Sequence, residues 1–280
     1  MAYPTVDAPY GLKPINLIGG QVFAGSTRSL PIQYGYATDI FYGEFVVLSR
    51  GFITRASVTT GTGSNQVTGI FLGCSYTDPV TKQKRFSQYW PASTLAGDAA
   101  AVVADDPDTV FKAVVCSATT AIASGALAMV GTNLSMINNT GNVNTGNSAN
   151  AVLAPTATPV STILPVRCVG VVEDTAFSVS ASGSSSGTAI TLTGSGLPAA
   201  IPIGTSVAYV ASNGQLIQTS SFVTAAASAG ATSVTLNSAI AVPGSVVAIP
   251  SASTIVFTQY PEILVKMNLL VHGYYSSTTA

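Results

Sequence analysis

The feature that most constrains this chain is the absence of charge from a long segment of its C-terminal half. No Asp, Glu, Lys, Arg or His occurs between residues 175 and 261, a run of 87 residues. An average soluble segment of this length carries about 22 charged residues. Such a neutral segment lies in a membrane, is disordered, or folds as a β module whose surface is made soluble by hydroxyl and amide groups.

The pattern of apolar residues decides between these three states. Ser, Thr, Gly and Pro interrupt every apolar stretch, so we expect no membrane span. β-Branched residues alternate with small and polar ones, as in 190–193, 207–210 and 233–236, whereas disordered segments are poor in β-branched residues. The sequence therefore predicts a neutral, hydroxyl-coated all-β module.

The distribution of charge suggests where the domains lie. Residues 1–112 hold 16 of the 21 charged residues, and charge returns only briefly before the neutral run and again after it. We predict an all-β chain with an N-terminal β-barrel or β-sandwich domain formed by 1–175 together with 260–280. A second, small β-sandwich domain, 176–259, is inserted near the C-terminus and projects outward, since insertions are tolerated at loop tips.

Several local elements can be predicted. Strands are expected at 45–48, 69–72, 101–104 and 110–115, because these apolar runs lie between turn-forming clusters. The Ala-rich stretch 120–130 lacks a polar face and contains a glycine, so we do not expect a helix there.

Two features of the neutral segment predict pairing. Asn213-Gly214 lies between two apolar pairs and predicts a hairpin with a type I′ turn. The stretches 188–192 and 232–236 resemble each other. This similarity reflects either a duplicated strand or only a shared composition.

The overall charge balance bears on partners. With 10 Lys plus Arg against 11 Asp plus Glu, the chain has no net field that would attract nucleic acid or an anionic membrane. The N-terminus has no basic start and no apolar core, so we expect no secretory signal and synthesis in a cytoplasm. The three cysteines are far apart, odd in number and set in apolar contexts, which predicts buried, reduced thiols.

Catalytic patterns are weak. The stretch 183–187 matches the nucleophile-elbow motif G-x-S-x-G, but it lies in a Ser/Gly run and not between a strand and a helix. The single histidine, His272, is expected near the surface at the end of a strand. No acid/base set converges, and the sequence predicts that the chain is not an enzyme.

The clusters of charged residues do not indicate a binding site either. The carboxylates of 105–108 lack the spacing of a calcium loop, so a solvated turn is expected, and the basic run 82–85 predicts an exposed turn. No Cys or His pair has the spacing of a zinc site. We therefore expect no metal and no cofactor.

Five segments, in order along the chain, nevertheless carry a resemblance. They are YGLKPINLIGGQ (10–21), AGSTR (24–28), GIFLGCSY (69–76), ADDPD (104–108) and PEILVKMN (261–268). They resemble small head proteins of tailed phages of marine and freshwater bacteria, similar to capsid decoration or cement proteins. The resemblance covers residues 1 to about 175 and 260 to 275, and it implies no catalytic residues.

This resemblance implies a structural virion protein that is made in the host cytoplasm and binds the outer surface of an icosahedral head. Its expected partners are the major capsid protein and further copies of itself, as a homotrimer or a dimer. The extended, apolar N-terminal arm suits an interface. The residues expected to bury against a neighbour are Tyr3, Val6, Tyr10, Leu12, Ile15 and Leu17. Alternatively, the arm is an ordinary edge strand of its own domain.

Two other classes of protein compete with this hypothesis. A surface adhesin or glycan-binding module needs exposed aromatic side chains, and the neutral segment offers only Phe177, Tyr209, Phe222 and Phe257. A hydrolase needs the acid/base set that the sequence lacks.

Overall fold

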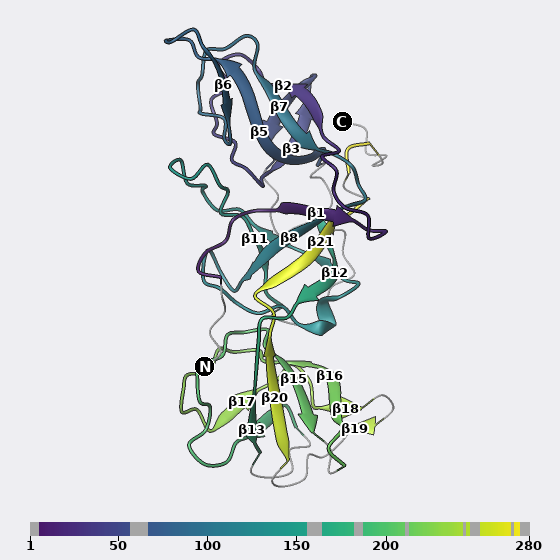
Figure 1. Cartoon of the computed structure of the whole chain (residues 1–280). Helices are drawn as coiled ribbons and strands as arrows, with labels where there is room; N and C mark the ends of the chain where they lie inside the picture. Colours follow the sequence, from purple (N-terminus) through teal and green to yellow (C-terminus); the bar gives the residue numbers. More distant parts are fainter. Residues whose placement is uncertain are drawn as a thin grey trace.

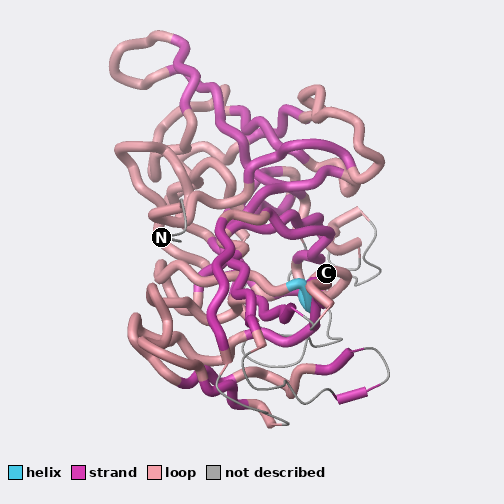
Figure 2. Tube along the Cα trace, turned by 60° about the horizontal axis from the view of Figure 1, so that its bottom comes forward, coloured by secondary structure: helices cyan, strands magenta, loops and turns pink. Residues whose placement is uncertain are grey.

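The computed structural model describes residues 6–56, 67–155, 164–181, 187–210, 213–242, 245–246, 253–269 and 272–274. Within these ranges the chain is all-β, as predicted, and it includes a nearly closed, barrel-like sheet. Three main sheets follow one another along the long dimension of the molecule (Figure 1). Figure 2 shows strands and loops with one short helical segment, the 3-10 turn η1 (Leu127–Met129). The described part of 120–130 thus contains no α-helix, as expected.

The first sheet is antiparallel and lies at the top of Figure 1. Its strand order is β2-β7-β5-β3-β4, with β6 paired to β5. The strands are β2 (Arg28–Pro31), β3 (Phe45–Ser49), β4 (Phe52–Arg55), β5 (Gly69–Thr77), β6 (Lys84–Ser87) and β7 (Ala100–Ala104). The only tryptophan, Trp90, is fully buried against this sheet and meets the ring of Tyr76 edge-on at 5.4 Å. Aromatic pairs favour this geometry.

The central sheet has seven strands in the order β10-β11-β8-β21-β12-β9, with β1 paired to β8. The strands are β1 (Lys13–Leu17), β8 (Thr109–Cys116), β9 (Asn133–Leu134), β10 (Met136–Ile137), β11 (Ala151–Leu153), β12 (Val166–Val172) and β21 (Glu262–Met267). Phe111 and Ile263 of this sheet share one buried cluster with Phe45 and Ile70 of the first sheet. The first 175 residues and β21 therefore build two sheets that share one core.

The neutral segment forms the third sheet, in the order β13-β20-β15-β16. Its strands are β13 (Thr175–Ser180), β15 (Ser206–Val210), β16 (Leu216–Phe222) and β20 (Thr254–Gln259). Two short pairs accompany it, β14 (Ala189–Thr191) with β17 (Ser233–Thr235) and β18 (Ala241–Val242) with β19 (Ser245–Val246). Val207, Ile255 and Phe257 belong to a buried cluster supplied entirely by this segment. Alternation of apolar and hydroxyl residues thus gives the uncharged segment a core.

Two local predictions for the neutral segment can be compared with its strands. The similar stretches 188–192 and 232–236 contain β14 and β17, which pair with each other, Ile190 opposite Val234. The hairpin at Asn213-Gly214 is confirmed, because β15 pairs with β16. Its loop is longer than the predicted two-residue turn, since Val210 is opposite Leu216. Within this loop the Asn213 side chain accepts a hydrogen bond from the Gln215 amide at 3.0 Å, which makes an Asx turn.

A two-stranded ribbon connects the central sheet to the third sheet. β12 pairs with β21 as far as Val172 opposite Glu262, and β13 pairs with β20 from Thr175 opposite Gln259. The same two chain segments therefore pass together from one sheet into the next (Figure 1). Both connections of the third sheet to the central sheet lie side by side in this ribbon.

The ribbon is interrupted at Tyr260-Pro261, where proline has no amide hydrogen to donate to a partner strand. Residues 124–125 supply the missing partners. The Ser124 hydroxyl accepts a hydrogen bond from the Tyr260 amide at 2.9 Å, and the Gly125 amide donates to the Tyr260 carbonyl at 2.8 Å. A loop from the central part of the chain thus closes the break between the sheets.

The same loop also contacts the neutral segment. The Ser124 amide donates to the Ile203 carbonyl at 2.9 Å, and the Leu127 amide donates to the Ser206 hydroxyl at 3.2 Å. Phe222 of β16 is fully buried in the core cluster of the first two sheets. The neutral segment is therefore packed against the rest of the chain and is not merely tethered to it.

Gly204 tests this packing. Its φ is +88°, and an added Cβ would lie 1.8 Å from the Ser124 carbonyl oxygen. Gly204→Ala is expected to lower the free energy of unfolding by more than about 1–3 kcal/mol, the cost of a left-handed non-glycine residue alone. Gly230→Ala is the matched control, because Gly230 has a φ of +81° and no atom within 4 Å of its added Cβ. Urea unfolding measures both; equal losses would show that the Ser124 contact yields easily.

Candidate interface and binding site

The N-terminal arm forms an edge strand of its own sheet. β1 pairs antiparallel with β8, with Lys13 opposite Lys112 and Leu17 opposite Thr109. Leu12 is fully buried in the shared core, and its amide donates to the Gly43 carbonyl at 3.0 Å. The described part of the arm is thus part of its own domain: it pairs with β8 and contributes Leu12 to the core.

The other residues predicted for an interface lie in different environments. Tyr3 is outside the described residues. Val6 and Tyr10 pack against a small cluster of β8 and β11, and Leu17 is half-buried. Ile15 is 37% exposed, because the register between β1 and β8 shifts at this residue and leaves it in a bulge.

Tyr10 is further held by polar contacts. Its hydroxyl donates to Glu262, which also pairs with Lys112 at 3.0 Å, and the Lys13 ammonium lies 4.0 Å from the centre of the Tyr10 ring. Burial and the Glu262 carboxylate raise the pKa of Tyr10, so the hydroxyl stays protonated and continues to donate. These contacts fix the start of the arm on β21.

A short hairpin after β1 exposes apolar side chains that the sequence analysis did not single out. The Leu17 amide donates to the Gln21 carbonyl at 2.7 Å, and Gly20 takes the positive φ that the turn needs. Ile18 is 50% exposed and Val22 80% exposed. We call Ile15, Ile18 and Val22 the arm patch. The Gly19-Gly20 pair was the sequence signal for this turn.

The basic run 82–85 is largely neutralised. Lys84 lies 2.8 Å from Asp98, and Arg85 lies 3.0 Å from Asp78. Hydrogen bonds from the Thr81 and Val80 amides and from Arg85 lower the pKa of Asp78, which keeps that carboxylate charged. The run is exposed, as predicted, but only its first two residues precede the strand: Lys84 and Arg85 begin β6.

His272 corrects the sequence prediction. It is fully buried and not near the surface, because it forms a bridge with Val67 and its Nε2 lies 3.1 Å from the Asp105 carbonyl oxygen. Asp105 also accepts a hydrogen bond from the Tyr274 hydroxyl at 2.9 Å and pairs with Arg28 at 2.5 Å. Asp105 is thus itself buried, and the turn at 105–108 is only partly solvated. This cluster fastens residues 272–274 to the first sheet.

Other reactive groups are inert or lie outside the described residues. Cys74, Cys116 and Cys168 are buried and free, and burial raises the pKa of the Cys74 thiol to about 12 and of the other two to about 11. In the described ranges no group of three His, Cys, Asp or Glu residues could hold a metal ion. Residues 182–186, which contain most of the G-x-S-x-G match, are not described.

The aromatic side chains of the neutral segment are also accounted for. Phe222 and Phe257 are fully buried, and Tyr209 is 6% exposed. Phe177 packs partly buried against the same cluster and lies 5.5 Å from Phe257, centre to centre. These four aromatic residues therefore serve the core and provide no exposed stacking platform.

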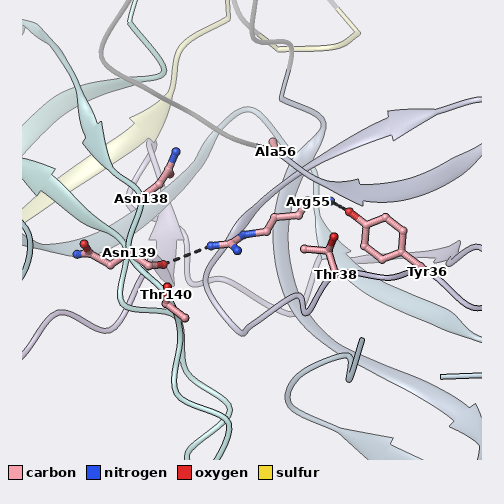
Figure 3. Close-up of a pocket in the computed structure, with 7 residues that line it drawn as sticks. All are labelled: Tyr36, Thr38, Arg55, Ala56, Asn138, Asn139 and Thr140. Atoms are coloured by element: carbon pink, nitrogen blue, oxygen red, sulfur yellow. Dashed lines mark hydrogen bonds between the residues drawn. The ribbon is translucent and has the colours of Figure 1, made fainter. Parts of the chain in front are cut away.

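A cavity of about 400 Å³ opens between the first sheet and the Asn-rich loop after β10 (Figure 3). Its lining residues come from the β2–β3 loop, the end of β4 and the loop at 138–140. They are Tyr36, Thr38, Arg55, Ala56, Asn138, Asn139 and Thr140. This volume lies at the small end of the range for ligand pockets, about 300–1,000 Å³.

Arg55, which lines this cavity, is half of an ion pair. The Arg55 guanidinium lies 2.8 Å from a Glu44 carboxylate that is completely buried, and the other Glu44 oxygen accepts the Phe41 amide at 3.1 Å. Burial raises the pKa of Glu44 to about 7, although Arg55 opposes the change. The sequence analysis missed this site because Glu44 and Arg55 occur in ordinary strand contexts.

Comparisons with known proteins identify no relative: no protein-family model matches the chain, and no curated protein matches it. Among the residues that the structure describes, no helix has the length and apolar character needed to cross a bilayer. Function must therefore be argued from the molecule itself.

The raised pKa of Glu44 predicts a pH dependence. Between its ordinary value of 4.5 and about 7, the folded chain retains a proton that the unfolded chain has released. The free energy of unfolding should therefore fall as the pH rises through this window, by up to about 3 kcal/mol. Glu44→Gln removes this titration. Urea unfolding at about pH 5 and pH 8 should show wild type losing stability relative to the variant; a relative gain would mean that attraction to Arg55 outweighs burial.

Proposed function

We propose that this chain is a structural virion protein that binds the outer surface of an icosahedral phage head and stabilises its lattice. One observation carries the proposal. Of the five segments that resemble decoration proteins, three contain β1, most of β5 and β21, one leads into β2 at Arg28, and one forms the β7–β8 turn. These elements are joined by pairing, as β1-β8-β21 and β2-β7-β5, and the two sheets share one core. The resemblance thus follows a connected framework and omits the neutral segment.

The polar groups of this framework favour a passive role. Asp105 and Glu262 form ion pairs that join distant parts of the chain, and Asp98 pairs with Lys84 at the surface. His272 is buried beside Asp105, where burial lowers its pKa and favours the neutral ring. These groups stabilise the fold, and none of them is arranged to act on a substrate. In this proposal the chain has no enzymatic activity.

The arm patch is the proposed contact with the major capsid protein or with a second copy of the chain. Its side chains are apolar and exposed, and β1, which carries Ile15 and leads into the hairpin with Ile18 and Val22, pairs with β8. A rigid support lowers the entropic cost of forming an interface. The neutral sheet lies at the far end of the molecule from the first sheet (Figure 1) and would project from the head. A homotrimer, or else a dimer, suits the local symmetry axes of a lattice.

Substitutions in the arm patch test this contact. Ile18→Asn combined with Val22→Asn should weaken binding to heads that lack this protein by more than about tenfold, because buried apolar anchors dominate interface energy. Thermal unfolding should change little, since both side chains are exposed. Val80→Asn is the control, as Val80 is 86% exposed on the first sheet. Loss of binding in this control alone would place the contact near β6.

Salt dependence provides a second test. Because the neutral segment has no Asp, Glu, Lys, Arg or His and the basic turn is largely paired, attachment should rest on apolar burial. Affinity for heads should change by less than about tenfold between low ionic strength and about 1 M salt. A steeper loss would identify the turn at 82–85 as the main anchor.

A further inference from the structure

The cavity at Arg55 is notable because the chain has so few charges. Only 10 of its 280 residues are Lys or Arg, yet one of them forms an ion pair with a completely buried carboxylate. Burying such a pair costs desolvation energy that its own attraction seldom exceeds. An ion pair placed at the wall of a cavity is therefore a candidate for a binding role.

Arg55 keeps hydrogen-bonding capacity for a ligand. A guanidinium has five N–H donors. One terminal nitrogen of Arg55 contacts both Glu44, at 2.8 Å, and the Asn139 carbonyl, at 3.3 Å. Nε and the second terminal nitrogen have no acceptor among the described residues. Figure 3 shows the side chain extending between Tyr36 and Thr38 on one side and Asn139 on the other.

The walls on both sides of Arg55 are held in place. The Asn139 side-chain amide donates to the carbonyls of Thr119 and Ala149, at 2.6 and 2.8 Å. On the opposite wall, the Arg55 amide donates to the Tyr36 hydroxyl at 2.9 Å. A site whose polar groups are already fixed loses little conformational entropy when a ligand binds.

The charge around the cavity selects the class of ligand. Glu44 lies 2.8 Å from Arg55 and cancels its positive charge once Glu44 is ionised, which requires a pH above its pKa of about 7. Above that pH the site has no excess positive charge to attract an anion. Two of the residues that line the cavity, Thr38 and Thr140, are exposed, and their hydroxyl groups can both donate and accept hydrogen bonds.

We propose that this cavity binds a neutral saccharide, with ring hydroxyls accepting from Nε and the free terminal nitrogen of Arg55 and exchanging hydrogen bonds with Thr38 and Thr140. The cavity volume of about 400 Å³ suits a small sugar. The site belongs to the first and central sheets and not to the neutral segment, whose aromatic side chains are buried. The proposal is independent of any role on a phage head.

Saturation-transfer NMR on the full chain at about pH 8, where Glu44 is ionised, tests this site. The probes are glucose, galactose, mannose, rhamnose and N-acetylglucosamine at about 10 mM, with glucuronate as the charged comparison. At least one neutral sugar should bind. Thr38→Val and Thr140→Val should each weaken that binding about three- to tenfold, the usual effect of one lost hydrogen bond. Arg55→Lys, which keeps the charge beside Glu44, should weaken it more.

Thr191→Val is the matched control, because Thr191 is exposed on β14 in the neutral segment. It should bind as wild type does. Three results would overturn the proposal: no neutral sugar binds, glucuronate binds while the neutral sugars do not, or binding persists unchanged in both cavity threonine variants. The two threonine variants decide the matter even if Arg55→Lys does not fold, since neither threonine is buried.

Discussion

The ribbon in which β12 and β13 pair with β21 and β20 is the constraint on which the arrangement of the sheets depends. It supplies β12 and β21 to the central sheet, and β13 and β20 to the third sheet. At its break, Pro261 cannot donate a hydrogen bond, and Ser124 and Gly125 satisfy the backbone groups of Tyr260. The Ser124 amide also donates a hydrogen bond to the Ile203 carbonyl. The loop at 124–125 therefore both closes the ribbon and holds the neutral segment against the core.

The sequence predicted those features that depend on neighbours along the chain. Alternating β-branched residues gave the all-β class, and Asn213-Gly214 marked the hairpin of β15 and β16. Features made by distant residues were missed. His272 is buried because it meets Val67 and Asp105, and the Arg55 site needs Asn139, 84 residues away. Such pairings leave no local periodicity, so a single sequence does not reveal them.

The arm divides its apolar side chains between its own sheet and the surface. Leu12 and the pairing of β1 with β8 stabilise the chain's own sheet, whereas Ile15 and Val22 remain exposed. The bulge at Ile15 and the turn at Gly20 produce this division, because each removes a side chain from the regular alternation of the strand. An exposed apolar patch on a firmly paired strand is typical of an interaction surface.

The uncharged segment has a consequence for degradation. Proteases that cleave after Lys or Arg find no site between Arg167 and Lys266, a stretch that contains the whole third sheet and its accompanying strand pairs. Proteases that require an acidic side chain find none from 175 to 261. Resistance to these enzymes follows from composition and does not depend on the fold, so it persists even when the segment opens. In the presence of such proteases, this chemical resistance extends the lifetime of the segment without any gain in folding stability.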